Sequence, residues 1–203
     1  SLPPQAWTVE AYADSVAGYL QVQRIGRAAV AGHSFGGYVA LALAERHAGL
    51  AHGLGLVASR SLADSDAARR GRFETIAKVR AQGAQALLPD LAAKLVAPDA
   101  PVRMQDRAAA CIAACSPEGI VAGLTAMATR PDRTRVVDSY ARPFLVIHGS
   151  VDQLIPEREA ARPSAAGGMA VREILAGVGH MPMWEAPEAS AASIVRWSSG
   201  AFR

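Results

Sequence analysis

One serine in the chain has neighbours that predict a nucleophile. It lies in Gly32-His33-Ser34-Phe35-Gly36, which fits the pattern G-x-S-x-G and follows an apolar run. A serine on a tight strand-to-helix turn has a strained backbone, and side chains two residues to either side would collide, so glycine is expected at both places. The strain lifts Oγ above the sheet and aims the next N–H at a developing oxyanion. We therefore predict Ser34 as nucleophile and the Phe35 amide as oxyanion donor.

A serine hydroxyl is a weak nucleophile at neutral pH and needs a base within hydrogen-bond reach. Among the five histidines, His180 lies in a glycine-flanked loop directly after the last strand-like run. Loops at the carboxyl ends of parallel strands are where sites in such sheets are built, so His180 is the predicted base. His148, at the end of the preceding strand, is the second choice. Of the other three, His33 is expected inside the turn but facing away from Ser34, His47 at a helix end and His52 in a loop.

The base must itself be oriented by a carboxylate at another strand end. Asp152 lies in a turn after an apolar run and is the predicted acid, the alternative being an aspartate that only stabilises the turn. Asp64 and Asp66, which follow an earlier apolar run, are the rival acids. The order Ser34, Asp152, His180 is that of one class of serine hydrolase and differs from the trypsin-like and subtilisin-like orders.

The elements that carry these residues alternate between short apolar runs and helical periodicity. This alternation predicts an α/β fold with a mostly parallel sheet. The predicted strands are 27–32, 53–58, 143–149 and 170–175, and the predicted helices beside them are 8–23, 38–47 and 187–197. Thr8 is expected to cap the first helix.

The segment between the second and third strands contains helical periodicity only. Ser116-Pro117-Glu118 marks one helix start, with an N-cap, a proline at the first position and an acid in the first turn. A crossover between parallel strands needs about a dozen residues, so a far longer helical insertion predicts a cap over the sheet, ordinary crossover helices being the alternative. The expected division is a core of residues 1–58 and 141–203 and a helical cap of residues 59–140.

Three stretches of the sequence resemble the bacterial α/β-hydrolase superfamily. They are GHSFGGYVALALAER at 32–46, SPEGI at 116–120 with AMATRPD at 126–132, and GHMPMWEAPE at 179–188. Within the superfamily, the likeness is closest to the 3-oxoadipate enol-lactonase-like hydrolases and cofactor-free haloperoxidases, and it runs over nearly the whole chain. The resemblance implies that Ser34 is the nucleophile, Asp152 the acid and His180 the base, below a helical cap.

The resemblance also implies that part of the fold is missing. Superfamily members begin with four further strands and a His-Gly loop that supplies a second oxyanion donor, whereas this sequence begins at the helix before the nucleophile strand. We therefore expect the C-terminal part of an α/β-hydrolase fold, in which the nucleophile strand has an exposed apolar edge.

These residues predict acyl transfer, in which a carboxylic ester or lactone is cleaved through an acyl-enzyme. A serine at the turn, where an aspartate would form an aspartyl ester, argues against dehalogenase and epoxide hydrolase chemistry. Two alternatives use the same triad: a cofactor-free haloperoxidase or perhydrolase, and a carbon–carbon bond hydrolase. An alternative of another class is a non-catalytic receptor with this fold, or an inactive fragment.

Composition narrows the partners to small molecules. The formal net charge is +3, and the Lys and Arg residues alternate with Asp and Glu and form no basic stripe, so nucleic-acid binding is not expected. No run of 18 apolar residues predicts a membrane span, and no His/Cys cluster has metal-ligand spacing, so neither metal nor cofactor is expected. Cys111 and Cys115, four apart on a predicted helix, are expected to be reduced core residues of a cytoplasmic protein. The sequence leaves open whether the protein forms a homo-oligomer.

Overall fold

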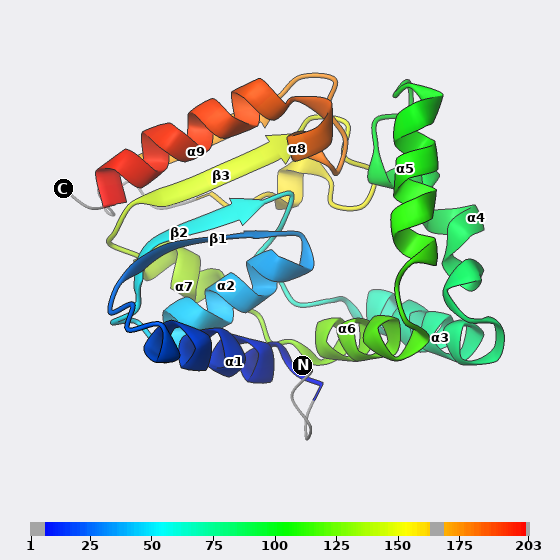
Figure 1. Ribbon diagram of the computed structural model, residues 1–203, viewed down its shortest axis with the longest axis horizontal. Helices are drawn as coiled ribbons and strands as arrows, with labels where there is room; N and C mark the ends of the chain where they lie inside the picture. The colour runs from blue at the N-terminus through cyan, green and yellow to red at the C-terminus, as the bar shows by residue number, and fades with distance from the viewer. Residues whose placement is uncertain (1–6, 163–168, 202–203) are drawn as a thin grey trace.

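The computed structural model describes residues 7–162 and 169–201 and shows a parallel sheet between two helical layers, with a helical arm at one end (Figure 1). The strands are β1 (Ala28–His33), β2 (Ala51–Val57), β3 (Phe144–Gly149) and β4 (Ala170–Leu175). They pair in the order β1-β2-β3-β4, every pair parallel. The predicted ranges for the core also include residues 1–6, 163–168 and 202–203, which lie outside the described residues.

Helices cover both faces of the sheet. One face carries α1 (Val9–Val22), α2 (Phe35–Arg46) and α7 (Thr134–Ser139), and the other carries α9 (Pro187–Ala201), preceded by the short α8 (Pro182–Glu185) (Figure 1). Because β2 and β3 are buried on both faces, they consist almost entirely of apolar residues and glycine. Thr8 accepts the amide of Ala11 at 3.2 Å, which confirms the predicted cap of α1.

The arm lies between β2 and β3 in the chain and is helical throughout its regular parts. Its elements are α3 (Asp66–Gln82), η1 (Ala84–Leu87), α4 (Leu88–Leu91), η2 (Ala93–Leu95), α5 (Val102–Ala113) and α6 (Pro117–Thr129). Ser116 caps α6 through the amide of Gly119, as predicted. We use the word cap for α3 to α6. The helix α7, inside the range predicted for the cap, instead packs on the sheet through Val137.

Two predictions about these elements are wrong. The helix expected from residue 38 begins at Phe35, directly after Ser34. Cys111 and Cys115 are free, but both are exposed and not in the core. The buried residues of α5 are Ala108 and Ile112. Cys111 lies outside this buried stripe, and Cys115 lies beyond the end of the helix at Ala113.

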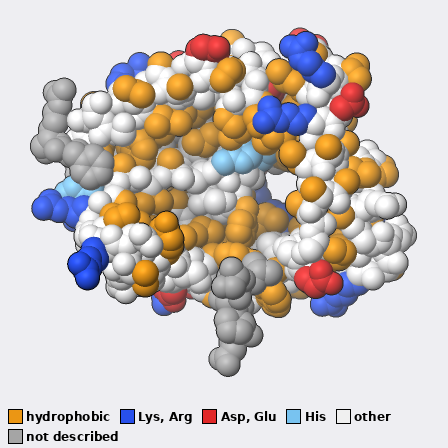
Figure 2. Space-filling model, viewed as in Figure 1, with side chains coloured by type: hydrophobic (Ala, Val, Ile, Leu, Met, Phe, Trp, Pro, Cys, Tyr) orange, Lys and Arg blue, Asp and Glu red, His pale blue; other side chains and the backbone are white. Residues whose placement is uncertain are grey.

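The strand β1 forms one edge of the sheet. Ala31 is exposed and Ala28 to Val30 are half-buried, whereas the equivalent part of β2 is buried. Figure 2 shows hydrophobic side chains gathered between the helical layers on this side. Among the described residues no single helix is long and apolar enough to cross a membrane, although α5 and α6, bent by 97° at their junction, pass that test as a pair.

Candidate active site

Ser34 lies at the sharp turn between β1 and α2. Its backbone has φ 48° and ψ −112°, a sparsely populated combination for a residue with a side chain. A Cβ on Gly32 would lie 2.0 Å from the carbonyl oxygen of Gly36, so residue 32 must be glycine. Nothing lies within 4 Å of a Cβ at Gly36, so the prediction of a collision there is wrong. The turn presses the carbonyl group of residue 36 onto residue 32, whereas a Cβ at residue 36 would point into open space.

The turn is also tied to the neighbouring strand. The Ser34 amide donates to the carbonyl of Val57 at 2.8 Å, and the hydroxyl of Ser59 donates to the carbonyl of Ser34 at 2.8 Å. Both partners belong to the end of β2 or directly follow it. The strained backbone is therefore held by hydrogen bonds on both sides of the serine.

The structure brings together the three residues predicted from the sequence. The Ser34 Oγ lies 2.8 Å from His180 Nε2, and His180 Nδ1 lies 2.7 Å from Asp152 Oδ2. His180 and Asp152 are buried, with exposed fractions of 2% and 6%. Each residue follows the carboxyl end of a different strand, and the parallel sheet brings these ends to one edge.

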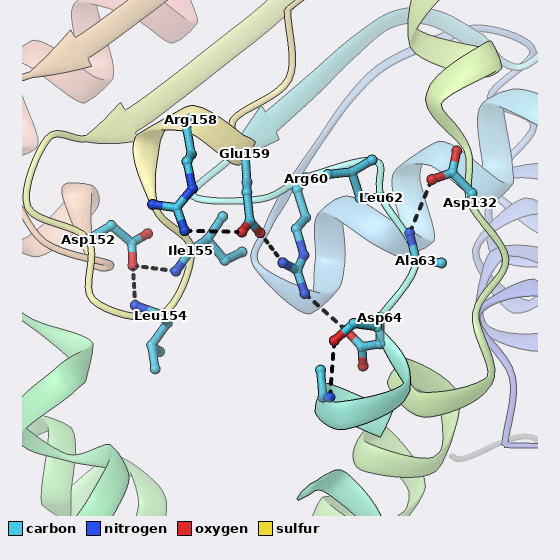
Figure 3. A network of polar contacts seen from close by, with 12 residues as sticks. Arg60, Leu62, Ala63, Asp64, Asp132, Asp152, Leu154, Ile155, Arg158 and Glu159 are labelled. Carbon is cyan, nitrogen blue, oxygen red and sulfur yellow. Dashed lines mark hydrogen bonds and ion pairs between the residues drawn. The ribbon is translucent and has the colours of Figure 1, made fainter. Parts of the chain in front are cut away.

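The remaining oxygen of Asp152 is occupied by the turn that follows it. Oδ1 accepts the amides of Leu154 at 2.8 Å and Ile155 at 3.0 Å (Figure 3). Burial by itself raises the pKa of Asp152, but the hydrogen bond and the charge of His180 and the two amides outweigh it and lower the pKa below its ordinary value. Asp152 is thus held as a carboxylate, with one oxygen free to orient the imidazole.

The second-choice base has a different place. His148 is fully buried, and its Nε2 donates to the carbonyl of Ile155 at 2.8 Å. The same nitrogen lies 3.6 Å from Asp152 Oδ2, which is beyond a good hydrogen bond. His148 therefore supports the turn that holds Asp152, and His180 is the histidine in contact with Ser34.

His33, predicted to face away from Ser34, contacts the loop that carries His180. Its Nε2 lies 2.8 Å from the carbonyl oxygen of His180, and the two rings are 5.0 Å apart between centroids. Burial lowers the pKa of His33, so the neutral ring donates to this carbonyl. The two other histidines lie at the surface, where His47 pairs with Asp14 and His52 with Arg27.

The rival acids are occupied elsewhere. The Asp64 side chain is 1% exposed and is held by Arg60 at 3.0 Å, by Arg130 at 2.9 Å and by Arg72 (Figure 3 shows the Arg60 contact). Burial raises its pKa, but the hydrogen bonds of Arg72 and Arg130 outweigh it and lower the pKa to about 2. Asp66 is exposed in the first turn of α3. Neither carboxylate is in contact with a histidine.

A cavity of about 790 Å³ between the sheet and the cap contains Ser34 and His180 on its wall. The space-filling view shows the molecule hollowed where the cap meets the core (Figure 2). The amide of Phe35 is at the first position of α2, so it has no acceptor within the helix and can serve an oxyanion. The apolar part of the wall comes from Phe35, Tyr38, Leu87, Leu91, Leu95, Leu124, Met127, Leu154 and Ile155.

The charged part of this wall is mostly cationic. Arg60, Arg72, Lys78 and Lys94 line the cavity, and Asp90 is the one acid among the described lining residues. Sequence reasoning missed these side chains. They are spread over 35 positions without a motif, and only the folded cap brings them around one space.

The comparisons with known proteins define the class. A family model described as Alpha/beta hydrolase family matches residues 1–193, and the chain belongs to this family. This confirms the predicted fold class. No curated protein sequence matches the chain significantly.

Solved structures of the same fold include three informative relatives. A thermophilic esterase from Thermogutta terrifontis, solved with malate bound, shares 28% identity at a TM-score of 0.89, over 98% of this chain and 75% of that one. The enol-lactonase from Burkholderia xenovorans LB400 shares 23% identity at a TM-score of 0.84, over 97% and 75%. The putative non-heme bromoperoxidase BpoC from Mycobacterium tuberculosis H37Rv shares 19% identity at a TM-score of 0.78, over 99% and 77%.

Proposed function

We propose that this protein is a serine hydrolase that cleaves carboxylic esters or lactones through an acyl-enzyme on Ser34. The observation that carries the proposal is the continuous hydrogen-bonded chain from Ser34 Oγ through His180 to Asp152, with contacts of 2.8 and 2.7 Å. Its open end faces a cavity large enough for a small ester. The esterase and enol-lactonase relatives support the same reaction class.

The proposed reaction begins with His180 Nε2, which accepts the hydroxyl proton as Ser34 Oγ attacks the substrate carbonyl. Asp152 accepts a hydrogen bond from Nδ1–H and stabilises the imidazolium. The Phe35 amide donates to the oxyanion of the tetrahedral intermediate. His180 then protonates the leaving oxygen as the C–O bond breaks. A water molecule, deprotonated by the same nitrogen, attacks the acyl-enzyme, and His180 returns this proton to Ser34 Oγ as the bond to the acyl group breaks and the acid leaves.

The cavity wall favours a substrate with an apolar body and an anionic end. Lys78 and Lys94 form no ion pair with the described residues, so their charges face the cavity rim uncompensated except by Asp90. A carboxylate on the acyl chain would lower the free energy of the bound substrate by up to about 1 kcal/mol for each exposed ammonium group it approaches. The malate in the esterase from Thermogutta terrifontis supports an anionic ligand in a related fold.

A matched pair of substrates tests both parts of the proposal. p-Nitrophenyl hexanoate and mono-p-nitrophenyl adipate have the same six-carbon acyl chain, and only the adipate carries a carboxylate. We expect both to be hydrolysed with a burst of p-nitrophenol equal to the enzyme concentration, and Ser34→Ala to abolish the burst. We expect the adipate to be preferred at low salt, with up to about fivefold of this preference lost in Lys78→Gln.

The outcomes separate the reaction from the substrate class. A burst that persists in Ser34→Ala contradicts the nucleophile. Equal kcat/KM for the two esters, or a preference unchanged in both Lys78→Gln and Lys94→Gln, contradicts the proposal of an anionic substrate but leaves the proposed reaction standing. Two expectations stay predictions from the sequence: that the substrate is a small molecule, and that the protein is cytoplasmic.

A further inference from the structure

The carboxylate of Glu185, the last residue of α8, accepts three backbone hydrogen bonds. Its Oε2 accepts the amides of Gly179 at 3.0 Å and Ala97 at 2.8 Å, and its Oε1 accepts the amide of Met181 at 3.1 Å. Gly179 and Met181 flank His180, whereas Ala97 belongs to the cap. Within the described part of the chain Glu185 enters no ion pair, so backbone amides are the groups that hold it.

The loop that carries His180 touches the cap backbone directly. A Cβ on Gly179 would lie 2.4 Å from the nitrogen of Ala97 and 2.5 Å from the carbonyl carbon of Val96, so no side chain fits between them. Val96 and Ala97 are buried, with exposed fractions of 0% and 3%. We call residues 93–97 the seated segment. The seated segment contacts the histidine loop through backbone atoms of both. No flexible side chain lies between them, so a movement of one backbone must displace the other.

One further contact holds the seated segment itself, and another holds the helix α5 that follows it. Gln153, the neighbour of Asp152, donates its Nε2 to the carbonyl of Val96 at 3.3 Å. On α5, the guanidinium of Arg107 lies 4.2 Å from the centre of the Trp184 ring, a cation–π contact with the residue before Glu185. The seated segment is thus bound to residues adjacent to the acid and to residues that follow the base.

The seated segment also reaches the cavity. Lys94 and Leu95 line its wall, next to Leu91 of α4. An acyl chain in the cavity would therefore contact the seated segment at Leu95. At the other end of this segment, the Ala97 amide binds the same oxygen of Glu185 as the Gly179 amide of the histidine loop.

We propose that Glu185 is a positioning residue that couples the orientation of His180 to the seating of residues 93–97. The proposal rests on the proposed function in assigning His180 the role of base. With the segment seated, the carboxylate holds the amides on both sides of the histidine, and Nε2 faces Ser34. When the segment lifts, Oε2 loses one of its two donors and the loop loses a fixed support. An acyl chain packed against Leu95 favours the seated state and hence the aligned base.

Graded substitutions test this coupling. Glu185→Ala removes both acceptor oxygens and with them all three hydrogen bonds, whereas Glu185→Gln can keep an oxygen for Gly179 and Ala97 while its NH₂ faces the amide of Met181. With p-nitrophenyl hexanoate we expect kcat to fall about 100-fold in the alanine variant, since misplacement of a catalytic group by about 1 Å costs that much. The glutamine variant should be intermediate, and KM should change less than kcat. Glu188→Gln, at an exposed acid in the first turn of α9, is the matched control and should leave kcat unchanged.

Hydrogen exchange supplies a readout that a simple loss of stability would not produce. In Glu185→Ala we expect faster exchange in two peptides, 93–97 and 177–181, with β2 still protected. Faster exchange in 177–181 alone would overturn the coupling, and faster exchange throughout the sheet would reduce Glu185 to a stabilising residue. Local exchange without a loss in kcat would overturn its positioning role. Because exchange needs no turnover, it tests the coupling even if Ser34→Ala shows that the proposed function is wrong.

Discussion

The replacement of Asp152 by asparagine has an outcome that the local hydrogen bonds dictate. Oδ1 accepts the amides of Leu154 and Ile155 at 2.8 and 3.0 Å. Since an amide NH₂ group cannot accept a hydrogen bond, the asparagine must keep its oxygen at this place. Its NH₂ then stands where Oδ2 now lies 2.7 Å from His180 Nδ1. Nδ1 is forced to accept, and the single proton of the neutral imidazole moves to Nε2.

The imidazole in this tautomer cannot take the proton of Ser34. The loss expected from a wrong tautomer with unchanged geometry is about 10⁴-fold in kcat, which corresponds to about 5 kcal/mol of transition-state stabilisation. KM should be nearly unchanged, because Asp152 is not among the residues that line the cavity. The assay is hydrolysis of p-nitrophenyl hexanoate by Asp152→Asn, with Asp99→Asn, at an exposed acid of the cap, as the control.

A loss of less than about tenfold in kcat in folded Asp152→Asn would contradict the role of Asp152 in setting the tautomer of His180. Asp64→Asn provides the complementary test, because Asp64 is the rival acid whose side chain is enclosed by arginines. If Asp64→Asn were the variant that lost 10⁴-fold in kcat, the assignment of the acid would be wrong.

Two further predictions concern the fold that supports the site. Gly32→Ala should abolish folding or activity, because its Cβ would lie 2.0 Å from the carbonyl oxygen of Gly36, whereas Gly36→Ala meets nothing within 4 Å and should keep nearly full activity; esterase assays of the two variants check this, and equal losses would contradict it. Asp64→Asn should lower the free energy of unfolding at pH 7 by about 2 to 3 kcal/mol, since the pKa of Asp64 is lowered from 3.8 to about 2. A carboxylate with a lowered pKa stabilises the folded protein at pH values above its ordinary pKa, and this stability is lost as pH falls towards the lowered pKa. In urea unfolding, the difference in stability between Asp64→Asn and the wild type should therefore shrink as pH falls from 4 towards 2. A difference independent of pH would contradict the assignment, and Asp66→Asn is the control.

The sequence was sufficient for the residues that local rules determine. The turn around Ser34, the caps at Thr8 and Ser116 and the apolar strands follow from patterns spanning a few neighbours, and the structure contains all of them. The order of Ser34, Asp152 and His180 along parallel strands also predicted their meeting, because such strands end at the same edge.

Other features depend on contacts between distant segments and could not be read from local patterns. Nothing near His33 indicates that its ring reaches the carbonyl of His180, 147 positions later. The helical periodicity of residues 102–115 does not show which stripe of the helix is buried, so the exposure of Cys111 was missed. The role of Glu185 likewise appears only when the cap amide of Ala97 is placed beside it.

In the proposed reaction, the hydroxyl of Ser34 is the nucleophile and His180 activates it. A fluorophosphonate probe followed by peptide mass spectrometry measures this directly, without any assumption about the substrate. We expect one label per chain on the peptide that contains Ser34, no label in Ser34→Ala and a strongly slowed reaction in His180→Ala. A well-folded protein that takes up no label, or one labelled at another serine with Ser34 unmodified, would contradict it.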